Sequence, residues 1–197
     1  MNLKRTLTAS VLALGAVAVS AGVGACASAP EQELVLGVPE ISAGGVPMPE
    51  SVEAKLEKRY HDALESPDVA VATETIAPSE RVDDIRGGAV DVTFGCVGEL
   101  LEQLDATKAD QLKQLYAQKK NPDPAKWRDI VHSSMLGSLP ADVGASDPGI
   151  SQPCPSDGLP QNLVALYNKE AIDRWDRTDL NNIAGGVTDK MIGVKKD

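Results

Sequence analysis

The sequence predicts an α/β fold in which a mostly parallel sheet is flanked by helices. Short apolar runs of strand length recur along the chain, segments with helical apolar spacing follow them, and the links between them are brief. This alternation implies right-handed crossovers, which place consecutive strands parallel in one sheet. A single domain built in this way is therefore expected.

Residues 1–25 are expected to be a cleavable export signal. Lys4 and Arg5 precede a run of small apolar residues, and this leader contains no acidic residue. The run is too rich in Ala, Gly and Ser to be a convincing membrane span. It ends in VGAC at residues 23–26, which resembles the lipobox of bacterial lipoproteins.

In a lipobox, the cysteine thiol receives diacylglycerol before the signal is cut. The resemblance implies that Cys26 carries acyl chains such as palmitate and holds the mature chain to the extracytoplasmic face of a cell membrane. Each buried methylene of an acyl chain contributes roughly 0.8 kcal/mol to anchoring. The alternative is an ordinary secretory signal whose small-residue cleavage site happens to contain a cysteine.

Charge and length limit the classes of partner. The sequence has 19 Lys and Arg against 29 Asp and Glu, and loss of the leader removes two of the basic residues, so the net charge moves from -10 to -12. Such a surface disfavours nucleic acid and anionic lipid headgroups. The 172 residues left after the leader can bury about 70% of the surface that the unfolded chain exposes, so one core is feasible without a metal.

Cys96 and Cys154 are the thiols that remain once Cys26 is lipidated. Disulfides persist in exported proteins, so we expect these two cysteines to pair. The bond would close a loop of 58 residues and contribute roughly 4 kcal/mol by the chain-entropy relation. The alternative is a buried free Cys96 and an exposed Cys154.

The first part of the α/β lobe is expected at residues 33–104, after a short tether at 26–32. Pro39 ends the first apolar run, and apolar residues then recur every four positions between residues 51 and 66. Ser79 is expected to cap the next helix, which Gly88 ends. The expected strands are 33–38, 69–76 and 90–94, and the expected helices are 51–66, 80–86 and 99–104.

Residues 105–159 are expected to form a helical insertion and a loop. Helical spacing marks residues 105–118, and Asp123 with Pro124 is a typical N-cap and first-turn pair that opens a second helix. Residues 139–160 contain five prolines and three glycines and predict a long irregular connection.

Residues 160–197 are expected to return to the lobe. The apolar run at 163–167 predicts a fourth strand, and Asn168 and Thr178 are expected to cap short helices. A final helical turn is expected from Thr188.

Two segments resemble the type II solute-binding proteins of ABC importers, in particular the glycine betaine and choline class. The first is RGGAVDVTFG at residues 86–95, which is similar to the family's third strand. The second is LPQNLVALYNKE at residues 159–170, followed by LNNI and TDKM, which is similar to its return strand and closing helices. The resemblance spans roughly residues 33–104 and 160–192. It implies that the chain binds a small solute noncovalently and delivers it to an ABC permease.

The chain also departs from that family. Where the family inserts an entire second α/β lobe, this chain has about 55 residues between Leu104 and Pro160. The family's betaine pockets hold a quaternary ammonium in an aromatic cage. Among the aromatic residues of the mature chain, only Phe94 and Tyr167 are expected near strand ends. The family resemblance still implies a quaternary amine or an amino-acid-like compound as the solute, although few aromatic residues are available for a cage.

In an open parallel sheet, ligands bind outside the carboxyl ends of the strands. Several of the residues placed there have a structural alternative to ligand contact. The alternative for Ser79 is to cap a helix and nothing more, and for Glu99 it is to interact favourably with a helix dipole. The alternative for Asn162 is to hydrogen-bond the loop backbone. The two glycines can serve only the turn. The candidate ligand-binding residues are Glu40, Ser79, Phe94, Gly95, Gly98, Glu99 and Asn162.

The sequence does not favour an enzyme. His61 and His132 lie on expected helices without the cysteine or acidic spacing of a zinc site, so no metal or cofactor is expected. There is no Gly-x-Ser-x-Gly elbow and no phosphate-binding loop with its lysine. The alternative to solute binding is a single-lobe envelope scaffold without a solute site, which docks a protein partner through Trp127 and Met135.

Overall fold

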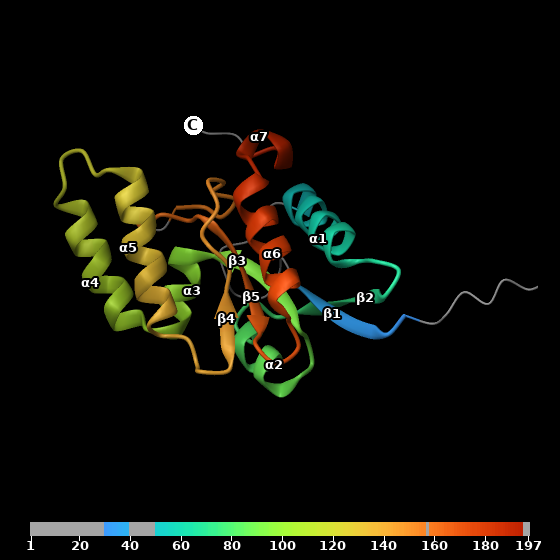
Figure 1. The fold of residues 1–197 in the computed structure, drawn as a ribbon. Helices are drawn as coiled ribbons and strands as arrows, with labels where there is room; N and C mark the ends of the chain where they lie inside the picture. Colours follow the sequence, from blue (N-terminus) through green and yellow to red (C-terminus); the bar gives the residue numbers. More distant parts are fainter. Residues whose placement is uncertain (1–29, 40–49, 157, 195–197) are drawn as a thin grey trace, which may run out of the picture.

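The computed structural model describes residues 30–39, 50–156 and 158–194 (Figure 1). The leader, Cys26 and Glu40 therefore lie outside the described residues. Within the described ranges, helices and strands alternate, and the chain is an α/β protein as expected. None of the helices described is long and apolar enough to cross a membrane.

Five strands form one mixed sheet, in the order β2-β1-β3-β5-β4. β1 pairs in parallel with β2 and with β3, whereas β5 pairs antiparallel with β3 and with β4. The expectation of a mostly parallel sheet is thus only partly matched, because β5 runs against its neighbours. The strands are β1 (Gln32–Pro39), β2 (Val69–Ile76), β3 (Val92–Cys96), β4 (Val143–Ala145) and β5 (Leu163–Asn168).

Helices cover both faces of the sheet, because alternate strand residues face opposite layers. Leu34 and Leu36 of β1 and Phe94 of β3 join one apolar core with α1, α6 and α7, whereas Val164 of β5 joins the other with α2 to α5. The layers are visible in Figure 1. The helices are α1 (Glu50–Leu64), α2 (Arg81–Gly87), α3 (Val97–Leu104), α4 (Ala106–Ala117), α5 (Pro124–Leu136), α6 (Arg174–Gly186) and α7 (Asp189–Ile192).

Several helix ends follow the expected local chemistry. The Asp123 side chain accepts hydrogen bonds from the first-turn amides of α5, with Pro124 in that turn. Gly88 ends α2 with φ of 73°, a left-handed conformation that glycine adopts without steric cost. The Thr188 side chain accepts from the Met191 amide and caps α7, as expected.

Other boundaries differ from the expectations. Ser79 is not a cap: it lies in the turn before α2, and Glu80 holds the N-cap position. Asn168 and Thr178 do not open two helices either, because one continuous α6 begins after Asp173. Asp173 and Asp176 form a reciprocal capping box there, and two hydrogen bonds to the helix terminus outcompete the isolated caps.

The segment between β3 and β5 packs onto the lobe. α4 and α5 lie against α3, and Ala109, Val131 and Met135 share the second core with sheet residues. β4 adds an outer strand to the sheet. The sequence did not predict this strand, because it lies in the proline-rich stretch that was expected to be an irregular connection. These residues therefore pack on the α/β lobe and add a strand to its sheet, and they do not form a second lobe that faces the first.

Candidate functional site

The strand order places a topological switch point between β1 and β3. β1 is joined to β2 on one side and to β3 on the other, so the connections that leave its carboxyl end and that of β3 diverge. Ligands of open α/β sheets bind in the crevice at such a point. The described residues at this point of the sheet are the end of β3 at Cys96 and the start of α3.

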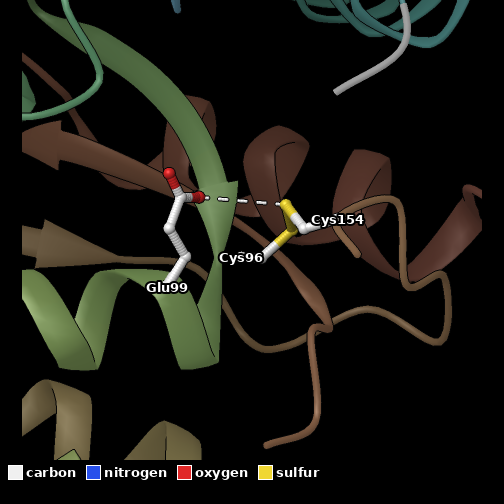
Figure 2. A group of neighbouring side chains, drawn as sticks. All are labelled: Cys96, Glu99 and Cys154. Atoms are coloured by element: carbon white, nitrogen blue, oxygen red, sulfur yellow. Dashed lines mark hydrogen bonds between the residues drawn. A yellow bond between two sulfur atoms is a disulfide. The ribbon is translucent and has the colours of Figure 1, made fainter. Parts of the chain in front are cut away.

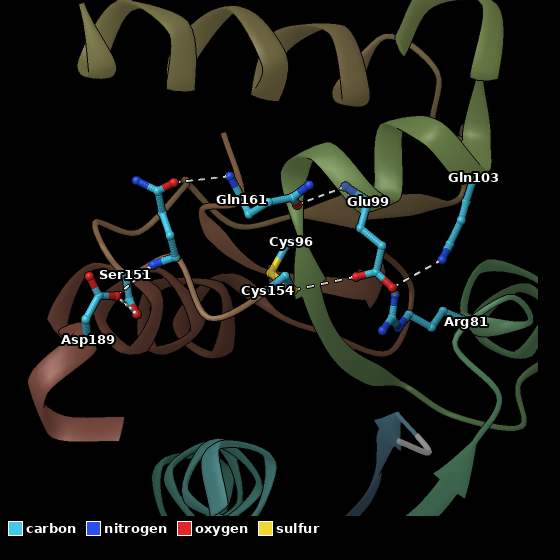
Figure 3. The surroundings of a disulfide bond; sticks show 9 residues. Arg81, Cys96, Glu99, Gln103, Ser151, Cys154, Gln161 and Asp189 are labelled. Carbon is cyan, nitrogen blue, oxygen red and sulfur yellow. Dashed lines mark hydrogen bonds and ion pairs between the residues drawn. A yellow bond between two sulfur atoms is a disulfide. The ribbon is translucent and has the colours of Figure 1, made fainter. Parts of the chain in front are cut away.

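A buried ion pair lies at this end of the sheet. Arg81, the first residue of α2, is only 2% exposed, and its Nη1 donates to Glu99 Oε1 at 2.9 Å. Glu99 lies in the first turn of α3, where its side chain is 11% exposed. The guanidinium lies over the backbone of β3, because a Cβ added at Gly95 would be 3.3 Å from Nη1. Figure 3 shows this arrangement.

The pair leaves polar atoms that the described residues do not fully engage. Arg81 Nε is buried and has no hydrogen-bond partner there. Glu99 Oε1 also accepts from Gln103 Nε2 at 3.3 Å, whereas Oε2 points toward the sulfur of Cys154 at 3.8 Å. A buried donor without a partner costs free energy, so an oxygen acceptor placed beside Nε would be stabilised.

The expected disulfide is present between Cys96 and Cys154, with Cα atoms 6.3 Å apart. Cys96 holds the N-cap position of α3, and Cys154 belongs to the irregular segment that follows β4. Figure 2 shows the disulfide facing the Glu99 carboxylate. Because a disulfide sulfur carries no proton, its 3.8 Å approach to Oε2 is a packing contact and not a hydrogen bond.

Gln161 completes the start of α3. Its Oε1 accepts a hydrogen bond from the Glu99 amide at 3.0 Å and so satisfies one free amide of the helix terminus. A Cβ added at Gly98 would come within 2.6 Å of Gln161 Nε2 and 2.9 Å of the Pro160 carbonyl. Glycine at position 98 therefore allows the 160–161 backbone to approach the helix.

The structure brings together three of the predicted ligand residues: Gly95, Gly98 and Glu99 lie around the end of β3. Asn162 is close in the chain to Gln161, but its Nδ2 donates to the Gly149 carbonyl at 2.8 Å, as in the alternative of a backbone-satisfying role. Ser79 is exposed in the turn before α2. Ligand contact by these residues stays a prediction.

Phe94 does not lie beside the Arg81–Glu99 pair. Its side chain is fully buried on the α1 face of the sheet and stacks on Tyr60 at a ring-centroid distance of 5.2 Å. Burial also raises the pKa of the Tyr60 phenol. Tyr167 pairs with Val92 at the opposite end of β3. The two aromatic residues expected near strand ends therefore form no cage beside Arg81.

Sequence reasoning missed Arg81 and Gln161. A basic residue in the first turn of a helix opposes the helix dipole, so local sequence patterns alone do not point to Arg81. The signal that could have found it is its position, since it follows β2 by the same rule that selected Ser79. Gln161 lies next to Asn162 in a proline-bounded loop, and only the fold shows which of the two amides faces α3.

The two histidines have partners of their own. His132 of α5 is buried, with Nε2 3.0 Å from the Ser146 carbonyl, and burial lowers its pKa. His61 of α1 lies with Nδ1 3.7 Å from Glu65. Neither ring belongs to a cluster of metal-ligating side chains among the residues described.

Comparisons with known proteins assign no family. No family model matches the chain, and no curated protein matches it. Among solved structures, a TRAP periplasmic solute-binding protein from Ochrobactrum anthropi has a TM-score of 0.46 at 8% identity, covering 84% of this chain and 77% of that one.

Two further structural likenesses have lower scores. A reduced form of OxyR from N. meningitidis has a TM-score of 0.32 at 13% identity, covering 78% of this chain and 94% of that one. CbnR, a LysR family transcriptional regulator, has a TM-score of 0.32 at 10% identity, covering 79% and 69%. Scores at this level identify neither a ligand nor a partner for this chain.

Proposed function

We propose that the chain is a solute-binding lobe that binds a small zwitterionic, amino-acid-like compound noncovalently at the carboxyl ends of β1 and β3. The observation that carries the proposal is the Arg81–Glu99 pair, a buried cation and anion side by side at the topological switch point. Membrane tethering through Cys26 and delivery to an ABC permease belong to the same proposal, on the strength of the lipobox resemblance.

The charges of the pair favour a ligand that carries both signs. The free Arg81 Nε is suited to a carboxylate oxygen, and Glu99 Oε2 is suited to an ammonium. A ligand with one charge would leave an excess charge in a desolvated site, which costs several kcal/mol. A zwitterion keeps the site neutral.

The same geometry separates the two solute classes expected from the sequence. Quaternary ammonium groups are held by aromatic faces. Phe94 is turned into the core and Tyr167 lies at the other end of the sheet. The Glu99 carboxylate can instead accept hydrogen bonds from a protonated amine, which favours an amino acid over a betaine. Because Arg81 is 2% exposed, ligand entry requires movement of the residues that cover it.

The alternative function, a scaffold that docks a protein partner, was expected to use Trp127 and Met135. Trp127 and Met135 are both buried, and the ring of Trp127 packs edge-on against that of Tyr116, with 4.9 Å between the ring centroids. The middle helices therefore do not present these two side chains to a partner.

A thermal-shift series on the full-length exported protein in mild detergent tests solute binding. The panel pairs amino acids with matched betaines, monocarboxylates and amines. A ligand at 100 times its Kd stabilises the folded state by about 2.7 kcal/mol, so amino acids are expected to raise Tm by several degrees. An unchanged Tm across the panel would overturn the proposal.

Matched variants locate the site. Arg81→Met is expected to abolish the shift caused by a ligand that binds the wild type. Arg86→Met is the control. Arg86 lies on the same helix as Arg81, but it forms an exposed ion pair, with its Nε 3.2 Å from Asp142 Oδ2. A shift that survives Arg81→Met would place the solute elsewhere.

A further inference from the structure

Three side chains with metal-ligating atoms meet at the start of α3. The sulfurs of Cys96 and Cys154 and a carboxylate oxygen of Glu99 lie within 4.8 Å of one another (Figure 2). Cys96 holds the N-cap of α3 and Glu99 lies three residues later. The first turn of α3 thus places Glu99 Oε2 3.8 Å from the sulfur of Cys154.

We propose that reduction of the Cys96–Cys154 disulfide creates a binding site for one divalent transition-metal ion, with Zn²⁺ the best suited. The ligands are the two thiolates and Glu99 Oε2, and a water molecule supplies the fourth position. Soft thiolate ligands in a four-coordinate arrangement select Zn²⁺ over Mg²⁺ or Ca²⁺. In the oxidised chain the sulfurs are bonded to each other, so the site exists only after reduction.

The orientation of Glu99 supports this assignment. One carboxylate oxygen, Oε1, already accepts from Arg81 and from Gln103, whereas Oε2 faces Cys154 Sγ. Arg81 thus holds the carboxylate by the oxygen that the metal does not need. Partners of this kind fix a ligand's direction, and their loss commonly costs 10-fold to 100-fold in metal affinity.

The charges balance in a buried site. Two thiolates and one carboxylate carry three negative charges, and the metal ion and Arg81 together carry three positive charges. Cys96 is fully buried, Cys154 is 7% exposed and Arg81 is 2% exposed, so neutrality matters here.

The chemical step needs an external reductant, for which we name a dithiol. The dithiol gives two electrons and two protons to the disulfide: the S–S bond breaks, two thiols form, and the dithiol becomes a disulfide. Metal binding then releases both thiol protons to water. Because the solute proposal concerns the oxidised chain, the two proposals stand or fall separately.

Cobalt binding to the full-length protein provides the test. The protein is reduced under argon, freed of reductant by desalting, checked by far-UV circular dichroism, and titrated with Co²⁺. One Co²⁺ per chain is expected, with a thiolate-to-cobalt charge-transfer band in the near ultraviolet and visible bands of a tetrahedral site. Zn²⁺ should displace the cobalt, and the oxidised protein should show none of these bands.

Variants test each ligand. Cys154→Ser should abolish the charge-transfer band of a two-thiolate site, and Glu99→Gln should weaken Co²⁺ binding at least 10-fold. Glu99→Asp, which keeps a negative charge for Arg81 but shortens the reach, should also weaken it and serves if Glu99→Gln does not fold. Glu102→Gln is the control, since Glu102 lies on the same helix and pairs with Lys113 at 3.0 Å.

Three results would overturn the assignment. The first is a reduced, folded protein that shows no thiolate band at micromolar Co²⁺. The second is unchanged Co²⁺ affinity in a folded Glu99 variant. The third is loss of the circular dichroism of the fold on reduction, because the three ligands would then not be held together.

Discussion

At the scale of single residues, the Arg81–Glu99 pair matters both for the proposed solute site and for the stability of the fold. Arg81 reaches it from α2 and Glu99 from α3, so the pair also joins two helices on one face of the sheet. A buried pair contributes little net free energy compared with apolar side chains of the same size. Removal of one partner, however, leaves the other charge buried and unpaired.

The first prediction follows from that asymmetry. Glu99→Gln should lower the free energy of unfolding by about 3 to 5 kcal/mol, because it leaves the Arg81 charge buried without a counterion. The double variant Arg81→Met/Glu99→Gln should be more stable than Glu99→Gln alone. Urea unfolding at pH 7 measures both. If the double variant lost as much free energy of unfolding as Arg81→Met and Glu99→Gln lose together as single variants, the two charges would not be coupled.

The second prediction concerns pH. Burial lowers the pKa of His132 in the folded state, so the unfolded chain binds a proton more readily. Stability should therefore fall as pH decreases below about 6.5, the ordinary histidine pKa. His132→Gln should reduce the fall in Tm between pH 7.5 and pH 5. An equal slope in His132→Gln would contradict the prediction.

Residue-level reasoning from the sequence predicted the disulfide and proposed Glu99 as a ligand residue, but it gave no role to Arg81. The disulfide followed from the number of cysteines and the export signal, and Glu99 followed from its place at the start of a helix. Arg81 acts through a contact with a residue 18 positions away, which local patterns do not specify. Phe94 was expected in the crevice because it ends an apolar run, yet alternation along β3 turns it to the α1 face.

At the scale of elements, the close packing of α3 against the 160–161 backbone positions the site. The strands and helices with strong apolar periodicity were predicted near their observed positions. β4 was not, since three residues among prolines and glycines carry no periodic signal. α6 was divided in two because Asn168 and Thr178 are good caps in isolation, whereas the stronger capping box at Asp173 lies between them.

The third prediction tests that packing. Gly98→Ala should lower the free energy of unfolding by about 1 to 3 kcal/mol, since the added methyl group would overlap Gln161 and the Pro160 carbonyl. Gly185→Ala is the control: it lies in α6 with nothing within 4 Å of an added Cβ, so it should stabilise the protein by about 0.4 to 1 kcal/mol. Equal effects of the two substitutions would show that space at position 98 is not limiting.

At the scale of the whole molecule, the Cys96–Cys154 bond ties the segment after β4 to the centre of the sheet. The fourth prediction is that Cys96→Ala/Cys154→Ala loses roughly 4 kcal/mol, the loop-closure entropy of 58 residues. Tm should fall by roughly 8 to 16 °C for a chain of this length. Differential scanning calorimetry measures the change, and an unchanged Tm would mean that other contacts hold the segment.

The fifth prediction concerns location. Cys26→Ser should release the protein from the membrane fraction, because no acyl chain would be added. Mass spectrometry of the native N-terminus provides an independent check, with a diacylglycerol-modified Cys26 expected as the first residue. A Cys26→Ser protein that still sediments with membranes would contradict the proposed anchor.

The position of β5 has a consequence for the order in which the chain can fold. β5 follows β4 in the sequence but lies between β3 and β4 in the sheet (Figure 1). A nascent chain that ends before residue 163 therefore lacks the strand that joins β4 to the rest of the ladder. Completion of the sheet therefore has to wait until most of the polypeptide, as far as Asn168 at the end of β5, is available.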